Sequence, residues 1–165
     1  MKESLLILGA GQYGCLVKEI AEATGDYYQI DFLDDNNPVA IGKLADYERF
    51  AEEYTCAAVA IGNPRLRMEY LEKLKDCYKL PILLHPRSWV SPSARVGMGC
   101  IIEPMAVIQA NVTVGAGCLI CAGAVVNHNS ELGEGCHIDC NSTVAARVKV
   151  TPHTKVCSGE VVLPD

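Results

Sequence analysis

Aliphatic residues recur at a fixed spacing over the second half of the chain. Residues 88–165 divide into thirteen consecutive six-residue blocks without an insertion, and the third residue of every block is aliphatic. A second column, two residues earlier, holds mostly small residues from Ala94 onward, and Glu160 is its one departure. The aliphatic column consists of Val90, Val96, Ile102, Ile108, Val114, Ile120, Val126, Leu132, Ile138, Val144, Val150, Val156 and Val162.

A period of six fits neither an α-helix nor an alternating strand. It is typical of a parallel β-helix of hexapeptide repeats, in which each block forms one short face, points one aliphatic side chain inward and turns a corner. Three faces close a coil of about 18 residues, and coils stack at the strand spacing of about 4.8 Å. The blocks therefore predict an all-β domain of a little over four coils across residues 86–165.

The first 85 residues show short apolar runs that alternate with amphipathic stretches. The expected order is strand, helix, strand, helix, strand, helix, strand, which predicts a small parallel sheet with helices on both faces, a Rossmann-like α/β domain. His85-Pro86 ends the last strand and sets the domain boundary. The expected strands are residues 5–8, 28–33, 57–61 and 81–84, and the expected helices are 15–23, 44–54 and 64–77.

A glycine turn joins the first predicted strand to the first predicted helix. Gly9, Gly11 and Gly14 match G-x-G-x-x-G in the strand–turn–helix context that this motif requires. Its glycines let the backbone approach a phosphate, and the N–H groups of the helix start attract it. Gln12 and Tyr13 join the glycines as candidate binding residues; the alternative is a tight turn without a ligand.

Two further loops are expected beside the glycine turn. Asp34 and Asp35 end the second strand about 20 residues beyond the turn, where an acid reaches a ribose hydroxyl. Gly62 and Asn63 follow the third strand, with Arg67 behind them. Ligands of open parallel sheets bind outside the strand carboxyl ends, so these loops predict a nucleotide site. NAD is an alternative ligand, although a half-sized domain joined to a β-helix disfavours a dehydrogenase.

Composition excludes other classes of protein. The net charge of −6 disfavours nucleic acid as a partner, because phosphate binding needs a basic surface. The sequence shows no signal peptide and no apolar run that approaches the ~18 residues of a membrane span, so we expect a cytoplasmic protein with no membrane contact.

Nine cysteines raise the alternative of a disulfide framework. Cys100, Cys118 and Cys136 recur at the coil spacing, so they fall in one column at a small-residue core position. Parallel side chains in such a column disfavour disulfide geometry, and the column offers no tetrahedral set for zinc. We therefore expect reduced thiols that behave as small hydrophobic residues.

One histidine stands at a corner of the predicted coil. His128 occupies a position where the coils above and below carry Ala110 and Ala146, which leave its imidazole accessible. Histidine titrates near neutral pH and can act as a general base on an amine or hydroxyl. His137 and His153 are weaker candidates, and each of the three could also be an ordinary solvated residue.

The two domains together resemble a family, through segments that cover nearly the whole chain. The combination is similar to bacterial sugar acyltransferases with hexapeptide repeats, which include sialic acid O-acetyltransferases and N-acetyltransferases of UDP-4-amino-sugars. The matching segments are Gly9–Gly14, Phe32-Leu33-Asp34-Asp35, Ala60-Ile61-Gly62-Asn63 with Arg67, Leu84-His85-Pro86 with Ser91-Pro92-Ser93-Ala94, and Val126-Asn127-His128-Asn129.

The resemblance implies a left-handed β-helix that assembles as a homotrimer and binds acetyl-CoA between neighbouring coils. The N-terminal domain would hold a nucleotide-activated amino sugar. His128 would take a proton from the sugar amine as it attacks the thioester, with Asn129 beside it and no metal. His137 matches a residue that contacts substrate or CoA, and Ala146 stands where the family has a CoA-facing glycine.

Departures from the family pattern keep other functions open. Asn129 stands where the family usually has an acid, Tyr13 where it commonly has a histidine, and the coil stack is short. These departures, with Ala146, favour the alternative of a non-catalytic trimeric module that binds the nucleotide-sugar and has a degenerate CoA site. The remaining alternatives are a sugar O-acetyltransferase and an NAD-binding oxidoreductase.

Overall fold

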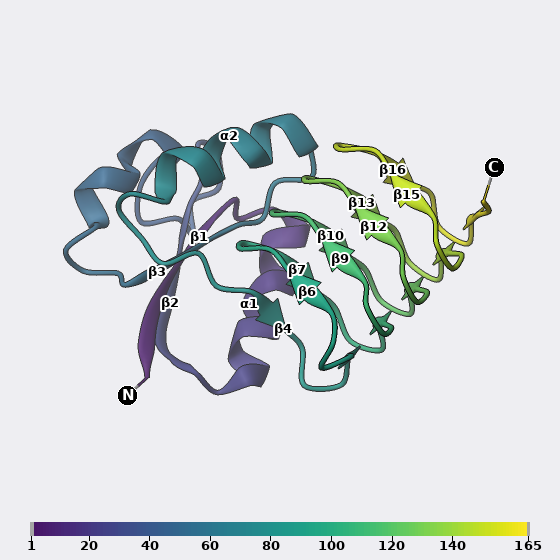
Figure 1. The fold of residues 1–165 in the computed structure, drawn as a ribbon. Coiled ribbons are helices and arrows are strands. Elements are labelled where there is room, and N and C mark those ends of the chain that lie inside the picture. The colour runs from purple at the N-terminus through teal and green to yellow at the C-terminus, as the bar shows by residue number, and fades with distance from the viewer. Residues whose placement is uncertain (1, 165) are drawn as a thin grey trace. The chain divides into compact units, whose positions relative to one another are not determined.

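The computed structural model describes residues 2–164, which form two compact units (Figure 1). The first unit ends at Pro81 and the second begins at Ile82. We call them the N-terminal unit and the coil and describe each by itself. No helix in the described part of the chain is long and apolar enough to span a membrane.

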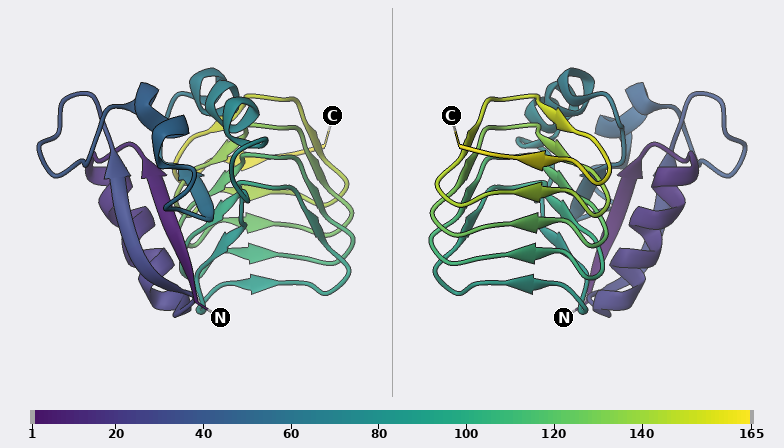
Figure 2. Two further views of the ribbon diagram at one scale, coloured as in Figure 1. Left: turned by 90° about the vertical axis from the view of Figure 1, so that its left-hand side faces the viewer. Right: turned by 90° about the vertical axis from the view of Figure 1, so that its right-hand side faces the viewer.

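Three parallel strands form the sheet of the N-terminal unit, in the order β2-β1-β3. Two α-helices and one 3-10 helix, η1, connect and flank them (Figure 2). The elements are β1 (Glu3–Leu8), α1 (Gln12–Thr24), β2 (Tyr27–Leu33), η1 (Leu44–Phe50), β3 (Cys56–Val59) and α2 (Pro64–Leu74).

Helices pack on both faces of this sheet because side chains alternate along each strand. On one face, Leu6 and Leu8 share a buried cluster with Leu71 and Leu74 of α2. On the other face, α1 packs so closely that a Cβ on Gly14 would lie 3.6 Å from the ring of Phe32. This arrangement confirms the predicted Rossmann-like class.

Two predicted elements of the N-terminal unit differ in the structure. The stretch 44–54 forms only the short 3-10 helix η1, a form typical of brief connectors. The run 81–84 does not add a fourth strand to the sheet. Leu83–Leu84 forms β4, which pairs with Ile101–Ile102 (β7) in the coil. A short apolar run fits either a sheet or a coil face, and these leucines continue the six-residue phase backwards by one block.

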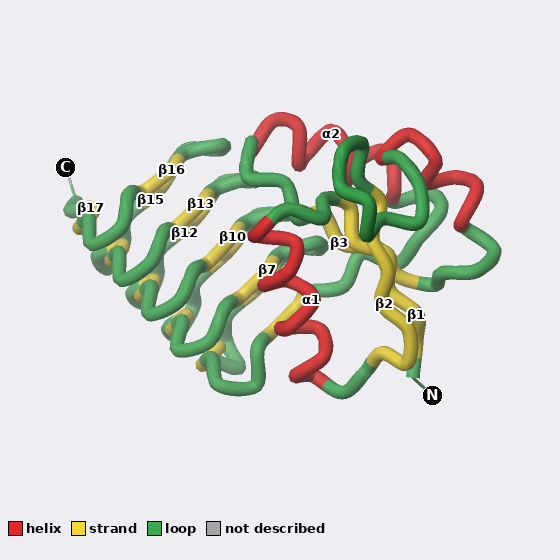
Figure 3. The backbone as a smooth tube through the Cα atoms, turned by 180° about the vertical axis from the view of Figure 1, so that it is seen from behind, coloured by secondary structure: helices red, strands yellow, loops and turns green. Residues whose placement is uncertain are grey.

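The coil consists of two-residue strands in three parallel sheets, ordered β16-β13-β10-β7-β4, β17-β14-β11-β8-β5 and β15-β12-β9-β6. Figure 3 shows these strands stacked coil upon coil, joined by corners. The described structure is the parallel β-helix that the repeats predict, and it is consistent with the left-handed form that the family resemblance implies. Its strands after β4 are β5 (Trp89–Val90), β6 (Arg95–Val96), β7 (Ile101–Ile102), β8 (Val107–Ile108), β9 (Thr113–Val114), β10 (Leu119–Ile120), β11 (Val125–Val126), β12 (Glu131–Leu132), β13 (His137–Ile138), β14 (Thr143–Val144), β15 (Lys149–Val150), β16 (Lys155–Val156) and β17 (Val161–Val162).

Both predicted columns form the core of the coil, as the hydrophobic cluster running from Cys100 to Val156 shows. Cys100, Cys118 and Cys136 are fully buried, and each thiol donates to a backbone carbonyl one coil on, at 3.1–3.2 Å. All nine cysteines belong to the described residues and are free thiols. The cysteine column is therefore part of the core and makes no disulfide.

The corners of the coil need a left-handed backbone at one residue each. Glycine supplies it at several corners, and asparagine, which tolerates positive φ better than most residues, supplies it at Asn111, Asn129 and Asn141. Their φ angles are 58°, 59° and 55°. Residues at equivalent corners of successive coils consequently lie at equivalent positions.

Candidate functional site

The corner at residues 127–130, which we call the His128 corner, follows strand β11. His128 and Asn129 are both exposed there. The backbone N–H of His128 donates to Asn127 Oδ1 at 2.9 Å and lies 3.3 Å from Gln109 Oε1 in the preceding coil. The Arg147 N–H of the next coil donates to the His128 carbonyl at 3.2 Å. The backbone that carries the imidazole is thus held from both neighbouring coils.

Two asparagine amides extend from the imidazole in a short chain. Asn129 Nδ2 lies 2.9 Å from His128 Nδ1, and Asn111 Nδ2 donates to Asn129 Oδ1 at 3.3 Å. In this orientation His128 Nδ1 accepts, so a neutral imidazole carries its proton on Nε2. A half-turn of both amides reverses the chain and leaves Nε2 free to accept a proton. The two orientations of the amide chain correspond to the two neutral tautomers of His128.

The other two coil candidates lie differently. Ala146 occupies the corner one coil beyond His128, where it is half-buried. His137 begins β13, in a different sheet from the one that precedes the His128 corner, and its Nε2 lies 3.3 Å from Cys121 Sγ. The structure therefore groups His128, Asn129 and Ala146, and places His137 on another face of the coil.

Two glycines of the turn at residues 9–14 are required by close packing. Gly9 has a φ of 106°, and a Cβ there would lie 2.8 Å from the Ala60 carbonyl oxygen. A Cβ on Gly14 would lie 2.1 Å from the Gly9 carbonyl oxygen. Gly11 caps α1 and faces open space, so the start of the helix stays uncovered beside Gln12. That uncovered start has the form of an anion site.

The Asp34 carboxylate links two of the predicted loops through hydrogen bonds. Its Oδ2 accepts from the Ala10 N–H at 2.8 Å, and its Oδ1 accepts from the N–H groups of Asn36 and Asn37 at 2.9 Å. Asn37 Nδ2 returns a bond to the Ala10 carbonyl at 2.6 Å. The bond from Ala10, followed by that from Asn36, holds the pKa of the Asp34 carboxyl below its usual value. Asp35 instead accepts from the Leu44 N–H at 3.1 Å.

The third loop is held by Asn63 and Arg67. Asn63 caps α2 by accepting from the Leu66 N–H at 3.0 Å, and Pro64 is the first helical residue as predicted. The buried Arg67 donates through Nη1 to the carbonyls of Ile61, at 2.8 Å, and Gly62, at 3.0 Å. These bonds hold the β3–α2 loop at the strand end from which the predicted nucleotide site is built.

All three loops follow neighbouring strands at one edge of the sheet. The Gly9 N–H donates to the Leu33 carbonyl and the Ala60 N–H donates to the Leu8 carbonyl, both at 2.8 Å. The structure thus brings the predicted binding residues of the N-terminal unit together. It also shows that several of them already hold the loops.

Some chemistry-bearing residues were missed by the sequence reasoning. Asn111 lies one coil before Asn129, and Cys121 and Asp139 share a corner column in successive coils. The available signal was their spacing, since residues one coil apart stack whenever the six-residue phase is unbroken.

Two family descriptions match the chain. Residues 4–74 match the family described as PglD N-terminal domain, and residues 93–128 match bacterial transferase hexapeptide (six repeats). A search of the curated proteins found no match.

Solved structures resemble the chain over nearly its full length. The acetyltransferase domain of PglB from Neisseria gonorrhoeae in complex with acetyl coenzyme A is 29% identical, with a TM-score of 0.87, covering 99% of this chain and 92% of that chain. A histidine-to-asparagine mutant of perosamine N-acetyltransferase from Caulobacter crescentus, in complex with CoA and GDP-perosamine, is 26% identical, with a TM-score of 0.65, covering 98% and 89%. WeeI from Acinetobacter baumannii, at 16% identity and a TM-score of 0.79 over 96% and 80%, shares the fold.

The coil, the glycine-turn sheet and these likenesses define an acetyltransferase built on hexapeptide repeats. These matches are consistent with the bacterial sugar acyltransferase family that the sequence resembles.

Proposed function

We propose that this protein transfers an acetyl group from acetyl-CoA to the amino group of a nucleotide-linked sugar, with His128 as the general base. The observation that carries the proposal is the exposed imidazole, held at a corner by both neighbouring coils and hydrogen-bonded at Nδ1. The similar structures support the substrates, since one contains acetyl coenzyme A and another contains CoA with GDP-perosamine.

The chemistry needs one proton acceptor beside the attacking amine. The amine nitrogen forms a bond to the thioester carbonyl carbon, His128 takes the amine proton, and the carbon–sulfur bond breaks. The released CoA sulfur then takes a proton, so the imidazole returns to its neutral form. General base catalysis of this kind contributes about 10²- to 10⁴-fold in rate.

Asn129 gives His128 a neutral partner in this mechanism. For Nε2 to accept the proton, Nδ1 must carry hydrogen and donate to Asn129 Oδ1, which is the reversed orientation of the amide chain. A neutral amide orients the ring but stabilises the charged imidazolium less than a carboxylate does. We therefore infer a slower base than a histidine–acid pair would supply.

The predicted loops of the N-terminal unit would hold the nucleotide. The uncovered start of α1 at Gly11, Gln12 and Tyr13 supplies N–H groups for phosphate. Asp34, Asp35, Gly62, Asn63 and Arg67 position that start and the loops next to it. In the coil, Ala146 would adjoin the CoA path and His137 would contact CoA or substrate, as the resemblance implies.

The decisive experiment measures thiol release from acetyl-CoA in the presence of UDP- and GDP-linked 4-amino sugars. We expect release that depends on the acceptor and falls about 10²- to 10⁴-fold in His128→Ala. His153→Asn is the matched control, because asparagine keeps the positive φ of that residue at a different corner. Turnover retained in His128→Ala would remove His128 from the mechanism, and release with hydroxyl-bearing sugars alone would indicate O-acetylation.

A second candidate is the non-catalytic module that binds a nucleotide-sugar and lacks a working CoA site. Asn129 favours it, because its neutral amide lies beside His128 Nδ1, where the family usually has an acid. Calorimetry with acetyl-CoA and with UDP separates the two: heat from the nucleotide alone supports the module. The proposed homotrimer is tested by light scattering, which should give three times 17.8 kDa.

A further inference from the structure

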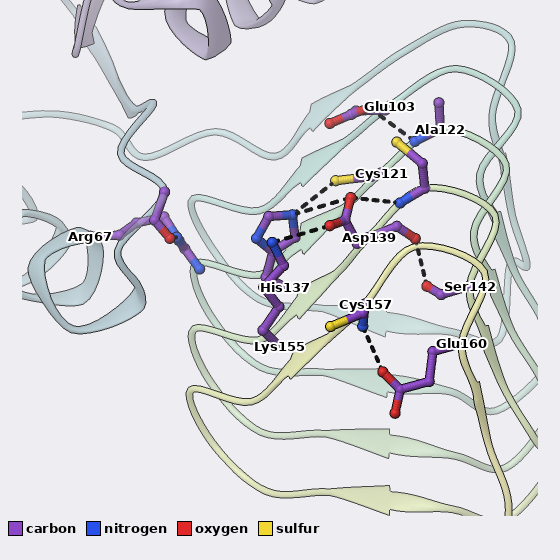
Figure 4. Close-up of polar contacts among 12 residues, drawn as sticks. Arg67, Glu103, Cys121, Ala122, His137, Asp139, Ser142, Lys155, Cys157 and Glu160 are labelled. Carbon is purple, nitrogen blue, oxygen red and sulfur yellow. Dashed lines mark hydrogen bonds and ion pairs between the residues drawn. The ribbon is translucent and has the colours of Figure 1, made fainter.

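Two thiols, an imidazole and two carboxylates gather on the sheet that runs from β4 to β16. Cys121 follows β10 and Asp139 follows β13, at equivalent corner positions in successive coils, while His137 begins β13. Glu103 follows β7, and Cys140 is next to Asp139. We call these five residues the Cys121 cluster; all belong to the coil. Figure 4 shows Cys121, His137 and Asp139 pointing toward one another.

The cluster has the spacing of a metal site. Cys121 Sγ lies 3.3 Å from His137 Nε2, which lies 4.0 Å from Asp139 Oδ1, and the three atoms are all within 4.8 Å of one another. Glu103 and Cys140 form a second such group with the same sulfur. Tetrahedral zinc, with bonds of about 2.0–2.3 Å, separates its ligand atoms by roughly 3.3–3.6 Å. The sulfur–nitrogen distance already fits, and the nitrogen–oxygen distance is slightly wider.

Asp139 has one oxygen available for a cation. Its Oδ2 pairs with Lys155 Nζ at 3.1 Å. Its Oδ1 accepts from the Cys140 N–H at 2.8 Å and lies 4.0 Å from His137 Nε2. Lys155 balances one negative charge of the cluster. A divalent ion bound by one thiolate and one carboxylate forms a neutral group with these two ligands.

The protein alone does not favour a charged thiol here. Cys121 is 4% exposed, and burial, followed by the nearby Glu103 carboxylate, raises the pKa of its thiol. A bound cation reverses this balance, because a thiolate on a metal is stabilised directly. The same carboxylates that oppose an isolated thiolate attract a cation.

We propose that Cys121, His137 and Asp139 bind a divalent cation of the zinc class, with Cys140 and Glu103 adjacent to the fourth position. A thiolate and an imidazole select zinc-class ions over magnesium or calcium, which prefer oxygen ligands. As the metal–sulfur bond forms, the Cys121 thiol loses its proton to solvent, so affinity falls as the pH is lowered. Binding requires no acyl substrate and no turnover, and it is independent of the role proposed for His128. As a metal ligand, His137 would give up the contact with CoA or substrate that the resemblance implies.

Cobalt is the probe, since Co²⁺ replaces zinc and reports its ligands. The full chain, stripped with chelator and reduced, is titrated with CoCl₂ under nitrogen. We expect one equivalent to give a thiolate-to-cobalt charge-transfer band and the intense visible bands of tetrahedral cobalt, and one equivalent of ZnCl₂ to remove both. Lowering the pH should abolish both bands.

Variants identify the ligands. Cys121→Ser should abolish the charge-transfer band, and Asp139→Asn should weaken binding at least tenfold. Cys157→Ser is the matched control: Cys157 lies in the same corner column, two coils beyond Cys121, and is exposed. It should bind as the unchanged chain does. Circular dichroism verifies that each variant is folded.

The cobalt spectra and the variants also define the results that would overturn the proposed metal site. A spectrum of octahedral cobalt without a thiolate band, or a thiolate band that survives Cys121→Ser, overturns the proposal. Should Cys121→Ser fail to fold, Asp139→Asn decides instead: a cobalt affinity equal to that of the unchanged chain counts against the site.

Discussion

The N-terminal unit and the coil are both built on parallel strands, yet they hold their loops in different ways. Loops of the N-terminal unit depend on side-chain hydrogen bonds, such as those of Asp34 with Ala10 and of Arg67 with Gly62. Corners of the coil are held by backbone bonds between successive coils, such as that from the Asn129 N–H to the Ala110 carbonyl at 2.9 Å. Polar side chains therefore have structural roles in the first unit, whereas the coil leaves many of them free for chemistry.

Natural probes report on the two units separately. All seven tyrosines lie before Pro81, and the single tryptophan, Trp89, lies in the coil. Tyrosine and tryptophan signals during denaturation thus distinguish changes in one unit from changes in the other. The following substitutions use this difference.

Gly14→Ala should have the largest effect, and it should act on the N-terminal unit. The new Cβ would lie 2.1 Å from the Gly9 carbonyl oxygen, so α1 must move away from the sheet. We expect a loss of more than about 4 kcal/mol in the tyrosine transition, as severe core clashes give. Gly11→Ala, which meets open space, is the control and should cost less than about 1 kcal/mol. Equal losses in both variants would contradict the clash.

Val144→Ala should weaken the coil by about 2 to 3 kcal/mol, because it leaves a cavity at a fully buried position of the aliphatic column. The loss should show in the tryptophan transition. The same substitution at Val161, which is 56% exposed, is the control and should change stability by less than about 0.5 kcal/mol. Equal losses of stability in the two variants would show that the coil does not depend on its aliphatic column.

Asp34→Asn should make the N-terminal unit less stable at neutral pH but not in acid. Hydrogen bonds from Ala10 and Asn36 lower the pKa of the Asp34 carboxyl in the folded state. The stabilisation is therefore complete above the unfolded value of about 3.9 and is lost as the pH falls through the folded value. We expect a loss of about 1 kcal/mol at pH 7, allowing for solvent exposure. In urea titrations the difference should shrink as the pH is lowered below about 3.9; a constant difference would exclude this linkage.

Asn111→Gly should have the smallest effect, confined to activity. Glycine keeps the left-handed backbone and removes the amide that donates to Asn129, so the tautomer of His128 is less well set. We expect a several-fold lower kcat/KM and unchanged tryptophan unfolding. Asn141→Gly, at an equivalent backbone position of another corner, is the control. If both variants behave alike, the amide chain has no part in catalysis.

Sequence reasoning performed differently on the two units. In the coil it predicted the inward columns and the exposed position of His128, because a strict period specifies which residues stack. In the N-terminal unit it predicted the three strands, the glycine turn and Pro64 at a helix start, but it misassigned Leu83–Leu84 and the extent of η1. Short apolar runs carry no information about their pairing partner. The rotamers that join Cys121 to His137, or Asp34 to Ala10, depend on tertiary contacts that no local pattern encodes.

The repeat of the corners also determines which changes in chain length the coil can accept. Successive sheets are offset by one block, and a residue returns to its own corner only after a full coil. Deleting one block before His128 would carry the imidazole around to the next corner, away from Asn111, whereas deleting a whole coil would keep every later side chain on its own face. Insertions and deletions in descendants of this gene should therefore accumulate in whole coils, and the coil number can drift while the geometry of each corner is inherited unchanged.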